Sequence, residues 1–243
     1  MRIAQITDLH IAPLGVATRD IDVRANFLRI LTAAAETEPD YLMLTGDLCY
    51  HDGQMEVYQW IREQLDKTAL PYGIIGGNHD DIPLMVSVFD EWAAHLHHDE
   101  LYYIPHPGII CLDTAKGCCR RRQWDWLKDT LDAYRDHTDL LIFMHHPPAP
   151  AGVRYMDDHY PFQEQETAMK LFSEFPGRIA VFSGHYHAER TVQMDNTTLY
   201  VTPSIFFQID PDAAEFKVDH RRPAWRDIHW TRQGLTTAVR YLD

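Results

Sequence analysis

Residue types that carry metal and acid–base chemistry recur in this sequence directly after short apolar runs. They form five strings: Asp8-Leu9-His10, Gly46-Asp47, Gly77-Asn78-His79-Asp80, His145-His146-Pro147-Pro148 and Gly184-His185-Tyr186-His187. Carboxylate oxygen, amide oxygen and imidazole nitrogen together suit Mn, Fe, Zn or Co. No cysteine occurs in the strings, which argues against a structural zinc site.

Histidine is abundant, with 15 His against 12 Gly in 243 residues. Imidazole is a common metal ligand and titrates near neutral pH. The candidate ligands number seven, more than one ion needs once a water is counted: Asp8, His10, Asp47, Asn78, His145, His185 and His187. Two ions about 3.5–4 Å apart can share a carboxylate and clamp a phosphoryl group. We therefore expect two divalent ions, with Asp47 as the natural bridge.

Strands and helices must position these strings. The β-branched runs predict strands at 3–7, 41–45, 72–75, 109–112, 140–144 and 179–183. Apolar residues at helical spacing predict helices around 23–34, 57–65, 124–134 and 168–175. Ligands of α/β sheets bind outside the carboxyl ends of the strands, so the five strings should converge on one place.

The pattern changes after residue 183 to short strands separated by turn residues. These strands are predicted at 190–194, 199–202, 205–209, 224–230 and 235–241. We expect them to form a second sheet packed on the first. The fold class expected is α/β, a double β-sheet sandwich flanked by helices. No repeat or linker interrupts the chain, which predicts one domain over residues 1–243.

Composition excludes several classes of partner. With 22 basic and 36 acidic residues, the net charge of -14 is a poor match to a long nucleic acid. No apolar run approaches the roughly 18 residues of a membrane span, and Asp8 precedes any apolar core of a secretory signal. The four cysteines lack the spacing of a disulfide framework. We expect a cytoplasmic protein with a small-molecule substrate and no membrane partner; a homo-oligomer stays open.

The five strings jointly resemble the motifs of the calcineurin-like metallophosphoesterase superfamily: D-x-H, G-D, G-N-H-[DE], a later H, and G-H-x-H. The resemblance implies a four-layer α/β/β/α fold with a bimetal centre. By motif match, one ion would be held by Asp8, His10, Asp47 and His187, and the other by Asp47, Asn78, His145 and His185. His79 would then be the acid or charge stabiliser beside the leaving group rather than a ligand.

Two further segments are similar to narrower groups. Residues 142–148 resemble bacterial cyclic-nucleotide and glycerophosphodiester phosphodiesterases, and residues 223–226 with 234–237 resemble bacterial 3',5'-cyclic AMP phosphodiesterases. The function implied is hydrolysis of a small phosphodiester, foremost a cyclic nucleotide, by attack of a metal-bridging hydroxide. The alternatives are a glycerophosphodiesterase, a phosphomonoesterase, and a metal-binding scaffold without activity. No Lys or Arg lies within the strings, which favours a monoanionic diester over a monoester dianion.

Some positions depart from the family pattern or have no fixed role. Gly76 stands where the family usually has proline, which removes no ligand. The string from Gly46 to Tyr50 matches one in which purple acid phosphatases use tyrosine as an iron ligand, but His10 would fill that slot here. Tyr50 is therefore predicted to be a wall residue. Three further assignments stay open: His146 beside the ions, His159 at a pocket rim, and Arg120, Arg121 and Arg122 as phosphate contacts or as a solvated face.

Overall fold

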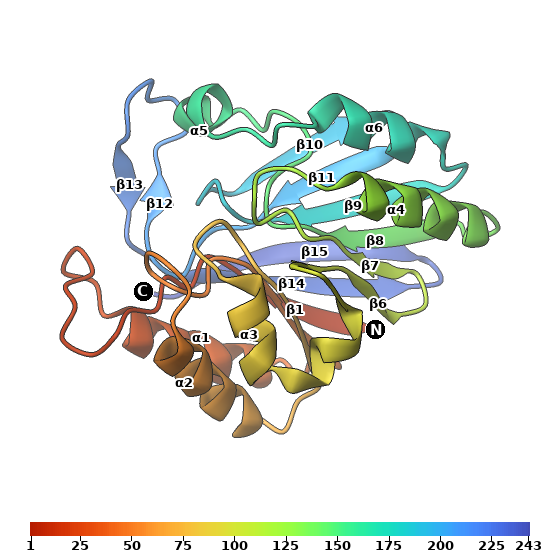
Figure 1. Cartoon of the computed structure of the whole chain (residues 1–243). Helices are drawn as coiled ribbons and strands as arrows, with labels where there is room; N and C mark the ends of the chain where they lie inside the picture. The colour runs from red at the N-terminus through yellow and green to blue at the C-terminus, as the bar shows by residue number, and fades with distance from the viewer.

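The computed structural model describes all 243 residues, and helices alternate with strands through the first two thirds of the chain (Figure 1). The helices are α1 (Val23–Ala35), α2 (Met55–Asp66), α3 (Ile82–Val88), the 3-10 helix η1 (Asp90–His95), α4 (Arg121–Ala133), α5 (Arg154–His159) and α6 (Gln165–Glu174). The strands are β1 (Arg2–Ile6), β2 (Tyr41–Thr45), β3 (Tyr72–Ile75), β4 (Leu96–His97), β5 (Glu100–Leu101), β6 (Tyr103–His106), β7 (Ile109–Cys111), β8 (Asp139–Phe143), β9 (Arg178–Ser183), β10 (Arg190–Met194), β11 (Thr197–Val201), β12 (Gln208–Ile209), β13 (Val218–His220), β14 (Ala224–Thr231) and β15 (Gly234–Tyr241). All four predicted helices are confirmed. The predicted strands are also present, although the one expected at 205–209 shortens to β12.

Two large sheets organise the chain. One has the order β15-β14-β1-β2-β3 and the other β10-β11-β9-β8-β7-β6. The strands β1–β3 run parallel in the first sheet, with antiparallel β14 and β15 at one edge. In the second sheet, β11, β9, β8 and β7 run parallel and antiparallel strands close both edges. The expectation that the C-terminal strands form a sheet of their own was wrong. They divide instead: β10 and β11 extend the sheet of β7–β9, and β14 and β15 extend the sheet of β1–β3. An apolar pattern identifies a strand but not the strand it pairs with.

The two sheets are covered by helices on their outer sides, which gives the expected α/β/β/α layering. In Figure 1, α1, α2 and α3 lie on the side of β1, and α4 and α6 on the side of β8 and β9. The buried residues of α1 are those of the predicted helical face: Val23, Phe27, Ile30, Leu31 and Ala34. The Asp22 side chain caps this helix by accepting the Ala25 N–H at 2.9 Å. No helix combines the length and the apolarity that crossing a membrane would require.

A chain of buried polar side chains connects the two sheets near their carboxyl ends. The Gln5 amide donates to Thr45 Oγ1 at 2.9 Å, Thr202 Oγ1 donates to Gln5 Oε1 at 2.6 Å, and Arg226 Nε donates to Thr202 Oγ1 at 2.8 Å. All four side chains are buried. A buried polar group left without a partner costs about 1–3 kcal/mol, so these bonds favour a single relative position of the sheets. That position sets the distance between the loops that follow the strands.

Candidate metal centre

The five loops predicted to converge do meet, because hydrogen bonds from their backbone N–H groups to carbonyl or carboxylate oxygens join them to one another. The links are Asp8 N to Gly46 O (3.0 Å), His10 N to Asp47 O (2.9 Å), Gly184 N to His145 O (3.0 Å), His185 N to both Asp8 carboxylate oxygens (3.0 Å each) and His79 N to Asp47 Oδ1 (2.9 Å). Three loops come from the five-stranded sheet and two from the six-stranded sheet. The site therefore lies across the carboxyl ends of both sheets.

Five of the seven candidate ligands have left-handed backbone conformations. Their φ angles are 52° at Asp8, 47° at His10, 50° at Asp47, 66° at His185 and 46° at His187. Asp and His adopt this region more readily than most residues, but it stays sparsely populated and costs on the order of 1–3 kcal/mol each. Five of the eleven non-glycine residues with positive φ are candidate ligands, and strain gathered in one place is typical of a functional site.

Two glycines of the motifs are required by close approach. A Cβ atom on Gly77 would overlap Asp47 Oδ1 and the Asp47 backbone nitrogen, and one on Gly184 would overlap Thr7 Oγ1 and Asp8 Oδ2. Three of these four atoms belong to the candidate ligands Asp47 and Asp8. Glycine therefore lets these backbones come close enough for the acidic side chains to face the histidines.

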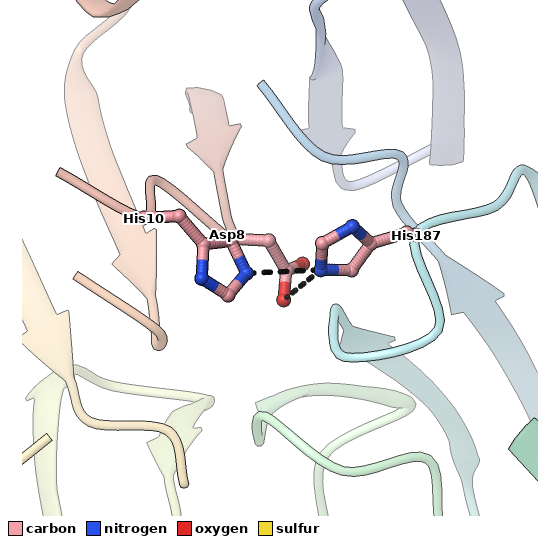
Figure 2. A group of neighbouring side chains, drawn as sticks. All are labelled: Asp8, His10 and His187. Atoms are coloured by element: carbon pink, nitrogen blue, oxygen red, sulfur yellow. Dashed lines mark hydrogen bonds and ion pairs between the residues drawn. The ribbon is translucent and has the colours of Figure 1, made fainter. Parts of the chain in front are cut away.

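The first group of facing side chains contains Asp8, His10 and His187, all of them buried (Figure 2). His10 Nε2 and His187 Nε2 lie 3.0 Å apart, and His187 Nε2 lies 3.4 Å from Asp8 Oδ1. The ligand atoms of this group all lie within 4.8 Å of one another. One carboxylate and two imidazoles facing a common point are donors for a divalent transition metal.

The second group contains Asp47, His145 and His185, also buried and also with ligand atoms within 4.8 Å of one another. His145 Nε2 lies 3.4 Å from Asp47 Oδ1 and 3.9 Å from Asp8 Oδ1. Asp47 Oδ2 in turn lies 3.7 Å from His10 Nε2. The Asp47 carboxylate thus lies between the two groups, as its expected bridging role would require.

The tautomers of three histidines follow from their backbone partners. In each ring one nitrogen is hydrogen-bonded to a backbone carbonyl oxygen: His145 Nδ1 to Thr45 (2.8 Å), His185 Nε2 to Tyr160 (3.0 Å) and His187 Nδ1 to Phe207 (3.0 Å). A carbonyl only accepts, so the nitrogen facing it carries the proton. The opposite nitrogen of a neutral ring then has a free lone pair. This arrangement, a ligand histidine oriented by a carbonyl, is the usual surrounding of protein metal sites.

His145 provides a direct test of whether these residues fit a cation. Its Nε2 atom is buried and has no hydrogen-bond partner. A buried nitrogen without a partner is costly, and an ion bound between Asp47, Asp8 and this nitrogen would satisfy it. Burial disfavours the charged form of His145, yet the neighbouring Asp47 and Asp8 raise its pKa to about 9, so these two carboxylates favour a positive charge at this point, which a metal ion would supply in place of the proton. The residues present therefore fit a bound divalent metal.

Burial is the largest influence on the pKa values of two further ligand candidates, His10 and His185. It lowers the pKa of His10 to about 3 and that of His185 to about 4. Both rings are consequently neutral at pH 7, which is the form that binds a metal. The Asp8 carboxyl is also buried, but His187 holds its pKa below the ordinary value, so it is ionised. The protonation states of His10, His185 and Asp8 at neutral pH therefore match those of metal ligands.

The remaining site residues lie at the edge of these groups. His79 is partly exposed, its Nδ1 lies 2.7 Å from the His51 carbonyl oxygen, and its Nε2 lies 3.9 Å from Asp47 Oδ2. Together with His10 and Asp47 it forms a third group able to hold an ion, so its geometry is compatible with either a ligand or an acid. Asn78 is exposed and lines a pocket beside His79.

Asp80 organises the site, and the sequence reasoning missed this role. Its partly buried carboxylate accepts four hydrogen bonds, from the N–H groups of Leu48 (3.0 Å), Cys49 (3.2 Å) and Gly77 (2.9 Å) and from the Tyr58 hydroxyl (3.0 Å). It therefore ties the loop after β2 to the loop after β3. Burial raises its pKa to about 6. Its place in the Gly-Asn-His-Asp string was the one available signal.

Three residues with open roles can now be placed. The His146 ring is buried 4.1 Å from the ring of His185, and its Nδ1 lies 3.1 Å from Thr114 Oγ1. The Tyr50 ring is half-buried, with its centroid 6.4 Å from that of His10 in an edge-on arrangement, so its role as a wall residue stays a prediction. His159 is exposed in α5, with its Nδ1 2.9 Å from the Tyr155 carbonyl oxygen.

The layered fold and the paired Asp/His groups are those of a metal-dependent phosphoesterase. The family model described as calcineurin-like phosphoesterase matches residues 1–189, and the chain belongs to this family. Over 98% of this chain and 93% of the relative, it is 34% identical to a probable cyclic nucleotide phosphodiesterase of Fibrobacter succinogenes. It is 29% identical to the 3',5'-cyclic adenosine monophosphate phosphodiesterase CpdA of Escherichia coli, over the whole chain and 90% of that protein.

A solved structure supports the fold independently. A dimetal phosphatase from Danio rerio superposes with a TM-score of 0.67 over 100% of this chain and 99% of its own, at 12% identity. At that identity the likeness concerns the arrangement of the sheets and helices alone.

Asp47→Ala should abolish metal binding, because this substitution removes the carboxylate that lies between both groups and 3.4 Å from His145 Nε2. We expect the bound metal, measured by elemental analysis after dialysis against Mn²⁺, to fall to less than about a tenth of the wild-type content. Asp52→Ala, an exposed carboxylate nearby, is the matched control and should keep full metal content. Wild-type metal content in the Asp47 variant would contradict the assignment.

Proposed function

We propose that the chain is a metal-dependent phosphodiesterase whose substrate is a small phosphodiester, foremost a cyclic nucleotide. The observation that carries this proposal is the pair of adjacent buried Asp/His groups, with Asp47 of the second group facing the first. The chain that holds them belongs to the calcineurin-like phosphoesterases. The two relatives described above, which match nearly the full length of this chain, are named as cyclic nucleotide phosphodiesterases, and this supports the substrate class.

The ligand sets proposed are those of the motif match. Asp8, His10, Asp47 and His187 would hold one ion, and Asp47, Asn78, His145 and His185 the other. The free lone pairs of the oriented histidines support this division, and the exposed side chain of Asn78 leaves it accessible to an ion. The mixture of oxygen and imidazole donors suits Mn, Fe, Zn or Co.

When bound, two divalent ions supply Lewis acidity toward the phosphoryl oxygens and lower the pKa of water from 15.7 to about 7. The task left to the protein is to provide a proton for the departing alkoxide. His79 suits this task because its ring is partly exposed beside the pocket and its Nδ1 is fixed on the His51 carbonyl. The His51 carbonyl accepts a hydrogen bond from Nδ1–H in both the neutral and the protonated ring. Nε2 is therefore the nitrogen that can deliver a proton.

A small diester fits the charge distribution better than the alternatives. The net charge of -14 opposes a long polyanion, whereas bound cations would invert the local potential at the site. A monoester dianion gains most from nearby Lys or Arg, and the five ligand strings contain neither. These charges support a monoanionic diester.

We further propose that residues 1–243 form a single domain located in the cytoplasm. One apolar cluster of 62 buried residues includes side chains from both sheets and from helices on both sides, which supports a single folding unit. The four cysteines are unpaired, and three of them are buried, as suits a reducing compartment.

The substrate proposal is tested by steady-state hydrolysis with the Mn²⁺-loaded protein. We expect kcat/KM for 3',5'-cyclic AMP and for bis(p-nitrophenyl) phosphate to exceed that for p-nitrophenyl phosphate by at least about tenfold. If glycerophosphodiesters are hydrolysed faster than every cyclic nucleotide, the chain is a glycerophosphodiesterase. Preference for the monoester would make it a phosphatase, and a metal-loaded protein inert toward all of them would be a scaffold.

His79→Ala should keep its metal and lose turnover. Loss of a general acid lowers kcat by about 10²–10⁴-fold for a poor leaving group such as a ribose alkoxide. The loss should be much smaller for p-nitrophenolate, which leaves without protonation. His159→Ala, another exposed histidine, is the control. An equal loss with both leaving groups, or a drop in bound metal, would show that His79 is a ligand instead.

A further inference from the structure

A pocket of about 480 Å³ opens beside the candidate centre. Asn78 and His79 line one side of it, and Lys116 lies on the wall formed with Asp99 and Ala115. Lys116 is the one Lys or Arg side chain in the lining, which otherwise contains four Asp residues: Asp52, Asp80, Asp81 and Asp99. A substrate bound at Asn78 and His79 would share this pocket with the Lys116 ammonium group.

The wall that carries Lys116 has more positive than negative charge. The Asp99 carboxylate contacts Lys116 Nζ, and it also lies 2.5 Å from Arg120 Nη2 and 3.6 Å from Arg122 Nη2. Glu100 pairs with Arg122 at 3.0 Å. Among these five side chains, three cations share two carboxylates, which gives this wall an excess of one positive charge.

Lys116 can leave Asp99 at little cost. Its side chain is 55% exposed, and ion pairs between exposed groups contribute little to stability. Arg120 remains on Asp99 when Lys116 turns away, so the carboxylate stays neutralised. The ammonium group is consequently held at the pocket wall but is free to exchange Asp99 for another anionic oxygen.

The arginine run beside Lys116 does not fill the same role. Arg121 is 94% exposed and pairs only with Asp125, one helical turn away at 3.8 Å. Arg122 pairs with Glu100 and donates to the His97 carbonyl, so both its charge and its donors are engaged. The open choice between a phosphate contact and a solvated face is thus resolved toward a solvated face for Arg121.

We propose that Lys116 is a substrate-binding residue that donates a hydrogen bond to a non-bridging phosphate oxygen, after release from Asp99. This inference rests on the proposed function in one respect, namely that a phosphate ester binds at the centre. It adds a protein cation outside the five ligand motifs, on the chain segment that follows β7.

The test is Lys116→Met, which keeps the aliphatic stem and removes the charge. With the Mn²⁺-loaded protein, we expect KM for 3',5'-cyclic AMP and for bis(p-nitrophenyl) phosphate to rise about tenfold, as expected for one lost charge-assisted hydrogen bond, while kcat stays within about twofold. Lys116→Arg should restore most of the affinity. Arg121→Met is the matched control, removing an equal charge from the solvated neighbour, and should leave KM unchanged.

A second measurement needs no turnover. Calorimetric titration of the Mn²⁺-loaded protein with inorganic phosphate should show about tenfold weaker binding for Lys116→Met and no change for Arg121→Met. Wild-type KM and wild-type phosphate affinity in Lys116→Met would overturn the inference, even if diester hydrolysis is confirmed. Conversely, Lys116-dependent phosphate binding in a protein that hydrolyses no diester would support Lys116 and refute the proposed function.

Discussion

The Asp47 carboxylate is the group on which the rest of the site depends. One of its oxygens accepts the His79 N–H and lies 3.4 Å from His145, and the other lies 3.7 Å from His10. Burial works against a charged carboxylate, yet His145 and His10 hold the pKa of Asp47 well below its ordinary value. Loops after four different strands are therefore oriented by one anion. A metal ion bound between these groups would neutralise the buried carboxylates of Asp47 and Asp8.

This arrangement requires a backbone that most sequences avoid. Five ligand positions with left-handed φ angles cost on the order of 1–3 kcal/mol each, a sum comparable with the ~5–15 kcal/mol net stability of a whole domain. The loops keep this geometry because neighbours over-determine it. Asp80 bonds the second and third loops together, and the Gln5–Thr202–Arg226 chain fixes one sheet against the other directly behind them. Rigid sheets thus support strained loops, and the strained loops aim the ligands.

Local features of the site could be predicted from the sequence, whereas its long-range partners could not. The strands at 41–45, 72–75 and 190–194 were predicted to the residue, since their apolar runs are bounded by turn residues. The convergence of the five strings followed from the rule that parallel strands present their carboxyl ends together. The pairing of β14 with β1 was missed because it joins residues more than 220 positions apart, and no local pattern encodes a partner. The contacts of Asp80 and the role proposed for Lys116 were missed for the same reason.

The central claim is that two ions bind on either side of Asp47, and anomalous diffraction from crystals grown with Mn²⁺ tests it most directly. The account predicts two anomalous peaks about 3.5–4 Å apart, with the Asp47 carboxylate between them and His145 Nε2 in contact with one. A single peak, or two peaks that do not share Asp47, would contradict it.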